Sequence, residues 1–150
     1  MIYLLRHGEA ERGGEDDAAR RLTGKGERQS LLAGRALAAL GARIDVCLTS
    51  PKVRAADTAR LACEALGLQP ETVGDLAEGG FDSLDLAAGR GVAMLVGHEP
   101  DFSNEIARLT GAKAKLRKGG LAVVDGNTLL ALLRPDELAA IAASGGRAHG

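Results

Sequence analysis

The chain opens with a short apolar run that passes directly into a charged tripeptide. Residues 2–5 (Ile-Tyr-Leu-Leu) are followed at once by Arg6, His7 and Gly8. An apolar run that ends at a glycine predicts a buried strand, and the loop after such a strand lies at the edge of an open α/β sheet where ligands bind. Arg6 would place a fixed cation at that edge, and His7 a nucleophilic nitrogen or a proton carrier. Gly8 would allow a sharp turn and the close approach of a ligand.

Strand and helix patterns alternate along the first two-thirds of the chain. Strands are expected at 45–50, near 71–73 and at 92–96, and helices at 23–41, 50–67, 83–88 and 101–111, with a mobile loop at 10–21. A hairpin at 121–133, a last helix from Pro135 and a frayed tail at 145–150 complete the chain. The alternation predicts an α/β three-layer sandwich, a mainly parallel central sheet with helices on both faces, as a single domain over 1–150.

Composition excludes several classes of function. Apolar residues make up 45% and charged residues 26% of the chain, and the net charge is -1, so we expect neither nucleic acid nor a membrane as partner. We find no 18-residue apolar run and no signal peptide. Cys47 and Cys63 are expected to be buried, reduced thiols without metal-ligand spacing, which favours a cytoplasmic protein without metal or cofactor. A monomer is compatible with the sequence, which leaves the oligomeric state open.

Three predicted strands end in loops that carry the most unusual chemistry of the chain. The first delivers Arg6 and His7, the second leads through Ser50 as helix N-cap to Arg54, and the strand at 92–96 delivers His98. If these strands share one sheet edge, two arginines and two histidines converge there. Guanidinium groups match phosphate oxygens bidentately, and a helix start adds backbone N–H donors, so the set predicts a site for a dianion.

The two histidines are expected to differ in role. Nearby guanidinium groups disfavour protonation of His7, which leaves a neutral nucleophile that can take up a phosphoryl group. His98 is better placed to donate to an equatorial oxygen and to stabilise charge in the transition state. Taken alone, each histidine is also compatible with a structural side chain, and Arg54 with a solvated helix face. Their joint occurrence at three strand exits favours a site.

Four segments, in order, resemble the motifs of the histidine phosphatase superfamily, also called phosphoglycerate-mutase-like. They are Leu-Arg-His-Gly-Glu (5–9), Leu-Thr-Gly-Lys-Gly (22–26), Ser-Pro-Lys-Val-Arg-Ala-Ala-Asp-Thr-Ala (50–59) and Val-Gly-His-Glu-Pro (96–100). The resemblance implies that His7 is the phosphorylated nucleophile and that Arg6, Arg54 and His98 form the phosphate pocket.

The short SixA-type phosphohistidine phosphatases are the branch that the chain resembles most. They share its compact length, the Gly-His-x-Pro exit and an Arg-x-Leu-Thr motif, here at 20–23. Arg20 is therefore a candidate substrate contact, or else a solvated loop charge. Many family members also carry an acid that protonates the leaving oxygen. Glu78 lies in the corresponding region, with Asp82 a poorer candidate, but SixA-type enzymes are thought to need no such acid.

The length of the chain bears on the substrate. Only 43 residues separate Arg54 from His98, which leaves no room for the long insertion that encloses small substrates in larger relatives. The first prediction is therefore a phosphohistidine phosphatase that acts on a phosphorylated protein of histidine-phosphorelay type. The alternatives are a phosphatase for a small phosphorylated metabolite, with Glu78 as general acid, and a non-catalytic phosphate-binding module. A mutase is disfavoured, because the site is too open to retain an intermediate.

Overall fold

The amino-terminal apolar run forms β1 (Ile2–Arg6), an interior strand of one six-stranded sheet, in a computed structural model that describes residues 1–147. The strands follow the order β3-β2-β4-β1-β5-β6. The other strands are β2 (Val46–Thr49), β3 (Glu71–Thr72), β4 (Ala93–Gly97), β5 (Leu121–Asp125) and β6 (Thr128–Leu133). The first four run parallel, whereas β5 and β6 form an antiparallel hairpin that joins the sheet beside β1. The predicted α/β fold with a mainly parallel sheet is confirmed.

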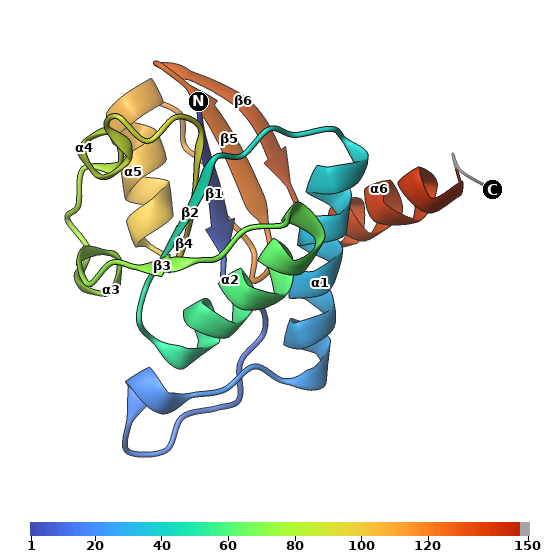
Figure 1. Cartoon of the computed structure of the whole chain (residues 1–150). Coiled ribbons are helices and arrows are strands. Elements are labelled where there is room, and N and C mark those ends of the chain that lie inside the picture. The colour runs from blue at the N-terminus through green and yellow to red at the C-terminus, as the bar shows by residue number, and fades with distance from the viewer. Residues whose placement is uncertain (148–150) are drawn as a thin grey trace.

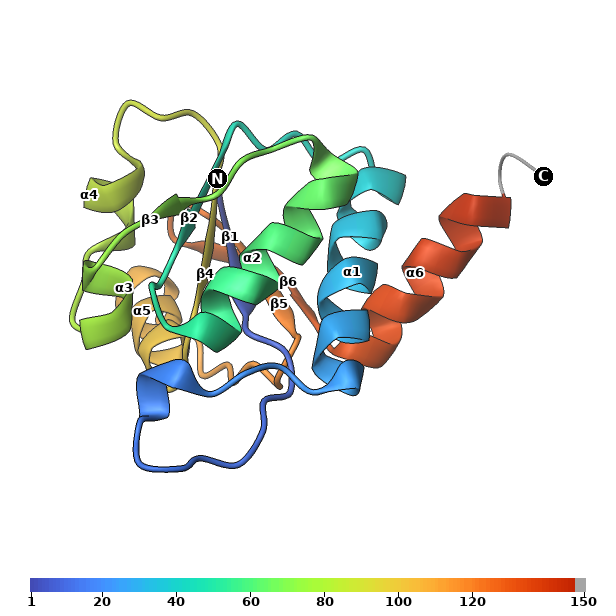
Figure 2. The ribbon, with the colours of Figure 1, turned by 60° about the horizontal axis from the view of Figure 1, so that its bottom comes forward.

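Helices cover both faces of the sheet (Figures 1 and 2). One face carries α1 (Gly24–Ala39), α2 (Val53–Leu66) and α6 (Pro135–Arg147). The other carries α3 (Asp75–Glu78), α4 (Ser83–Ala87) and α5 (Asp101–Thr110). Alternate residues of β1, β2, β4 and β5 contribute to the two cores, so that Leu4 packs toward α5 while its neighbour Leu5 packs toward α1 and α2. Cys47 and Cys63 lie buried as free thiols in the core between the sheet and α2, as predicted.

The observed helix starts agree only in part with those predicted from the sequence. Thr23 caps α1 as expected, since its hydroxyl accepts from the backbone N–H of Gly26 at 3.1 Å. The prediction that Ser50 is the N-cap of α2 is wrong. The helix begins at Val53, with Lys52 as its N-cap residue. The Ser50 hydroxyl accepts from the Lys52 N–H at 3.2 Å, because the chain needs one more turn to leave the strand before the helix can start.

Two further segments differ from expectation. The stretch between residues 73 and 83, for which the sequence analysis predicts no helix, contains the short helix α3. The tail predicted to fray from Gly145 continues as α6 to Arg147; residues 148–150 lie outside the described part of the chain. Gly145 does not end this helix because it packs against α1, where a Cβ at this position would lie only 2.3 Å from the Ala39 Cβ. The glycine therefore serves a close contact between helices rather than a chain end.

Candidate active site

The register of β1 and β4 places the two histidines next to each other. Arg6 pairs with Gly97, and the His7 backbone N–H donates to the Gly97 carbonyl at 3.0 Å. The next residue of each strand exit is therefore a histidine, and the rings of His7 and His98 lie 5.3 Å apart, centroid to centroid. Two residues that are 91 positions apart in the sequence thus meet at the carboxyl edge of the sheet, as their motifs predict.

His7 is held as a neutral imidazole with one free lone pair. Its Nδ1–H donates to the Gly8 carbonyl at 2.7 Å, which leaves the lone pair on Nε2. Burial, together with the charges of Arg54, Arg6 and Arg20, lowers the pKa of His7 to about 4, against the opposing effect of the Gly8 hydrogen bond. At neutral pH, Nε2 is therefore available as a nucleophile.

His98 is oriented by a residue that the sequence analysis assigned only to a helix cap. The Nε2 atom of His98 lies 2.8 Å from the Ser50 hydroxyl, whose backbone in turn pairs with β4. Burial, together with the neighbouring His7, Arg54 and Lys52, lowers the pKa of His98 to about 3, against the opposing charge of Asp17. Because the Ser50 hydroxyl oxygen already accepts from the Lys52 N–H at 3.2 Å, we assign its hydrogen to Nε2 of the neutral ring, which places the ring hydrogen on Nδ1. The position of Ser50 at a strand exit was the one signal that could have identified it.

Buried donors gather around these histidines. The Arg6 Nη1 donates to the Leu116 carbonyl at 2.9 Å, and the Arg54 Nη1 to the Asp17 carbonyl at 2.8 Å. Among the described side chains, four buried polar atoms make no hydrogen bond, and three of them are Arg6 Nε, Arg54 Nε and His98 Nδ1. Unpartnered buried donors are costly, so their clustering in one place indicates a site that an oxyanion completes.

Asp17 is a site residue that the sequence analysis missed. Its carboxylate lies 3.2 Å from Arg54, 3.1 Å from Arg20 and 3.5 Å from Lys52. Hydrogen bonds from Arg20 and Arg54 lower the pKa of Asp17 to about 2, although the side chain is exposed. In Figure 2 the loop that carries this residue, with the 3₁₀ turn Asp17–Ala19, lies beside the first turn of α2. The contact between Asp17 and Arg54 was not predictable, because the charged loop that carries Asp17 has no periodicity that would indicate its position.

Arg20 joins the cation cluster through this loop. Its Nη1 pairs with Asp17, and its Nε donates to the Glu11 carbonyl at 2.9 Å. Its charge also contributes to the low pKa of His7, so it lies within electrostatic reach of the nucleophile. Its role as a substrate contact stays a prediction.

Gly8 is required by a close approach of two backbones. A Cβ on Gly8 would lie 2.5 Å from the Gly26 carbonyl oxygen, and a Cβ on Gly26 would lie 2.0 Å from the Glu9 carbonyl oxygen. The Gly8 N–H also donates to the Thr58 hydroxyl at 3.0 Å. The glycine therefore locks the loop after β1 against the start of α1 and against α2; a direct contact of Gly8 with substrate stays a prediction.

Glu78 lies apart from these hydrogen bonds. It is an exposed residue of α3, and within the described part of the chain it makes no hydrogen bond or ion pair. The next residue, Gly79, packs against Asp101, whose Oδ1 would lie 2.8 Å from a Cβ at that position. Burial raises the pKa of Asp101, an effect that Glu99 reinforces and Lys52 opposes. Asp101 directly follows the His98 motif and is a second carboxyl group beside the site that the sequence analysis did not single out.

Two further kinds of feature, a metal-ligand cluster and a membrane-spanning helix, are absent from the described residues. Within residues 1–147, His, Cys, Asp and Glu side chains form no group of three that could hold a metal ion. No helix in that range has both the length and the apolar composition of a membrane span. Activity without metal or cofactor stays a prediction.

The low pKa values predict that acid destabilises the fold in a defined pH window. Below about pH 6.5 the unfolded chain binds protons on His7 and His98, whereas the folded state takes them up only near pH 4 and pH 3. The contribution of these two histidines to the free energy of unfolding is thus fully present above pH 6.5 and is lost as the pH falls. We expect the free energy of unfolding to drop by about 2–3 kcal/mol for each histidine between pH 7 and pH 4.5, measured by urea denaturation in chloride buffers.

The matched control for this experiment is the double variant His7→Asn/His98→Asn. It carries no titrating imidazole at either position, so its free energy of unfolding should change much less over the same window. An equal pH dependence in the variant and the native protein would contradict the assignment of the two low pKa values.

Comparisons with known proteins agree with this geometry. The family model of the histidine phosphatase superfamily (branch 1) matches residues 2–101. An uncharacterized protein of Picosynechococcus is 34% identical over 134 residues, covering 80% of this chain and 81% of the relative. A phosphohistidine phosphatase SixA homolog of Haemophilus influenzae is 31% identical over 128 residues, covering 75% and 78%.

The fold agrees as well. The structure of the protein histidine phosphatase SixA complexed with tungstate superposes with a TM-score of 0.81 at 24% identity, covering 91% of this chain and 98% of that one. Because only 24% of the residues are identical, this similarity is evidence for the fold alone. The family match over two-thirds of the chain and the relatives above 30% identity indicate common descent with the histidine phosphatases. The chain therefore belongs to the histidine phosphatase superfamily, in its SixA-type branch, and is a phosphatase.

Proposed function

We propose that this phosphatase removes phosphate from phosphohistidine side chains of another protein, through a covalent phosphohistidine at His7. The observation that carries the proposal is the neutral His7, with its lone pair on Nε2, beside buried donors of Arg6, Arg54 and His98 that no protein group satisfies. A nucleophile and a set of oxyanion donors in one place are the two requirements of phosphoryl transfer without a metal.

In the first half of the reaction, Nε2 of His7 attacks phosphorus. A P–N bond to His7 forms while the P–N bond to the substrate imidazole breaks, and the leaving nitrogen, which is basic, takes its proton from solvent. The guanidinium groups of Arg6 and Arg54 hold the equatorial oxygens, and His98 Nδ1–H donates to the charge that accumulates on them.

In the second half, water attacks the phosphorylated His7. The new P–O bond forms as the P–N bond breaks, inorganic phosphate leaves, and the same donors stabilise the same distribution of charge. His7 returns to its neutral form because the burial and the cations that lower its pKa remain in place.

A protein substrate is supported by the architecture around the site. The segment between α2 and β4 contains only β3 and the short helices α3 and α4, so this segment supplies no domain that would enclose the strand exits. The Haemophilus relative carries the name phosphohistidine phosphatase SixA homolog, which supports the same substrate class. A non-catalytic phosphate-binding module would have no need of a neutral nucleophile.

The second candidate is a phosphatase for a small phosphomonoester. An alkoxide leaving group needs a proton delivered as its bond breaks, which Glu78 or Asp101 would have to supply. The raised pKa of Asp101 is the observation in favour of this candidate, because it keeps a larger fraction of that carboxyl protonated near neutral pH.

The acid variants distinguish the two candidates. We expect Glu78→Gln to leave hydrolysis of a phosphohistidine protein nearly unchanged, because a protonated imidazole leaves without further help. Asp101→Asn is the matched variant for the second carboxyl group. Rates with the phosphoprotein, an alkyl phosphate and an aryl phosphate over a pH series provide the measurement.

The small-molecule candidate predicts a different pattern. One of the two variants would then lose about 10²–10⁴-fold with the alkyl phosphate and little with the aryl phosphate, whose leaving oxygen is already stable. A native enzyme that prefers alkyl phosphates, or a comparable loss with phosphohistidine, would overturn the proposed function.

A further inference from the structure

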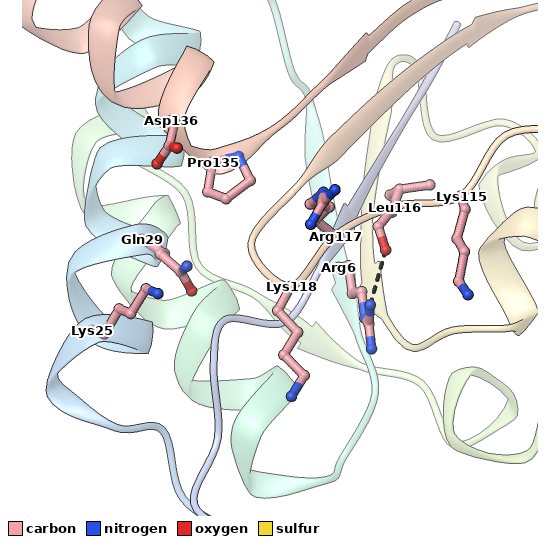
Figure 3. Close-up of a pocket in the computed structure, with 9 residues that line it drawn as sticks. All are labelled: Arg6, Lys25, Gln29, Lys115, Leu116, Arg117, Lys118, Pro135 and Asp136. Atoms are coloured by element: carbon pink, nitrogen blue, oxygen red, sulfur yellow. Dashed lines mark hydrogen bonds between the residues drawn. The ribbon is translucent and has the colours of Figure 1, made fainter.

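A basic groove with a volume of about 660 Å³ adjoins the phosphate site (Figure 3). Its lining includes five cationic side chains, from β1, from the first turn of α1 and from the segment between α5 and β5: Arg6, Lys25, Lys115, Arg117 and Lys118. Among the described residues that line it, Asp136 is the one carboxylate. Because the whole chain carries a net charge of -1, this excess of positive charge is local.

Four of the five cations of the groove form no ion pair within the described part of the fold. Lys25, Lys115, Arg117 and Lys118 are exposed, and in the described part of the chain none of them pairs with a carboxylate. The cations on the other side of the site differ, since Asp17 pairs with Arg20, Lys52 and Arg54. Figure 3 shows the side chains of Lys118, Arg6 and Lys115 extending in the same direction.

Hydrogen bonds hold the groove at a fixed position relative to the nucleophile. The Arg6 guanidinium donates to the Leu116 carbonyl at 2.9 Å, and the Gly119 N–H donates to the His7 carbonyl at 2.9 Å. The Leu116 N–H donates to the Glu99 carboxylate at 3.1 Å, next to His98. The basic segment is thus tied to both strand exits of the site, and Arg6 belongs to the phosphate site and the groove at once.

We propose that the groove docks an acidic surface of the phosphoprotein substrate, with carboxylates that flank its phosphohistidine. The inference rests on the proposed function and specifies its partner. The volume accommodates several side chains rather than one oxyanion, and mobile lysines suit carboxylates presented by a folded surface. The chain has only two Phe, one Tyr and no Trp, and none of these lines the groove, so the stacking platform of a single-strand nucleic-acid site is missing among the described lining residues.

The expected signature is electrostatic. Complementary charge accelerates association and lowers KM, with little effect on the chemical step at saturation. The effect must weaken with salt, because the lysines lie in solvent within reach of screening ions.

The test compares Lys115→Glu/Lys118→Glu with the control Arg35→Glu/Arg60→Glu, which makes the same change of net charge on exposed residues outside the groove. The substrates are a histidine-phosphorylated carrier protein with acidic residues beside its phosphohistidine, the same protein with those residues changed to amides, and 4-nitrophenyl phosphate. We expect the ratio of kcat/KM for the acidic phosphoprotein to that for 4-nitrophenyl phosphate to fall by about 10–100-fold in the groove variant, through KM. The ratio should stay nearly constant in the control, and the amide substrate and high salt should remove the difference.

The outcomes separate the docking site from the proposed function. A native enzyme that does not hydrolyse the phosphoprotein would contradict the proposed function itself. If it hydrolyses the phosphoprotein but the ratio is unchanged in the groove variant, or falls equally in the control, the docking site is wrong. A bisphosphorylated small molecule serves as a fourth substrate. If kcat/KM in the groove variant falls for this molecule and not for the acidic phosphoprotein, docking is overturned and the groove is assigned to a second phosphate group.

Discussion

Replacement of His7 by alanine is expected to abolish both turnover and the formation of a phosphoenzyme. Among the described site residues, His7 offers a neutral ring nitrogen with a free lone pair, Nε2, because Nδ1 donates to the Gly8 carbonyl. Loss of a covalent nucleophile costs on the order of 10⁴–10⁶-fold in kcat. The measurement is transfer of ³²P from a labelled phosphohistidine protein, with the acid lability of a P–N bond as its chemical signature.

The control for this variant must show that the pocket survives. His7→Gln keeps most of the side-chain volume, and binding of inorganic phosphate to Arg6 and Arg54 should persist in both variants. Label found on another residue, or activity above about one per cent of the native rate, would contradict the nucleophile assignment, because a 10⁴-fold loss leaves far less.

His98→Ala is expected to slow the chemistry by about 10²–10³-fold while leaving His7 able to accept the label. The reason is that His98 contributes a donor rather than the nucleophile. Its Nδ1 is buried without a partner, and its ring is oriented by the Ser50 hydroxyl at 2.8 Å. Single-turnover rates of phosphorylation and dephosphorylation of His7 provide the measurement, since both steps pass through the same charge distribution.

Ser50→Ala is the matched variant for His98. It keeps the ring but removes the hydrogen bond that fixes its tautomer, so a loss smaller than that of His98→Ala is expected, about 5–10-fold if one neutral hydrogen bond is at stake. Unchanged single-turnover rates in His98→Ala would overturn the assignment of a transition-state donor. Complete loss of labelling would assign His98 to the nucleophilic step instead.

The sequence by itself determined the framework and which candidate site residues lie together. The run at 2–5 had to be a buried strand, and the motifs at 50–59 and 96–100 had to follow strands of the same sheet. Parallel strands end at one edge, so Arg6, His7, Arg54 and His98 were predictable as neighbours without any knowledge of distances. Periodicity and glycine positions act over a few residues, which is the range over which sequence patterns are reliable.

Only the tertiary structure decided how these groups are held and what surrounds them. Asp17 pairs with Arg54 from a loop without periodicity, and Ser50, which was expected to cap a helix, contacts His98 instead. The groove joins Lys25 to Lys118 across 93 positions of sequence, and its position follows from hydrogen bonds between the backbone of 116–120 and the loop after β1. Such contacts depend on the packing of segments far apart in the chain, and no local pattern encodes them, because their free energy arises only when the whole sheet brings the segments together.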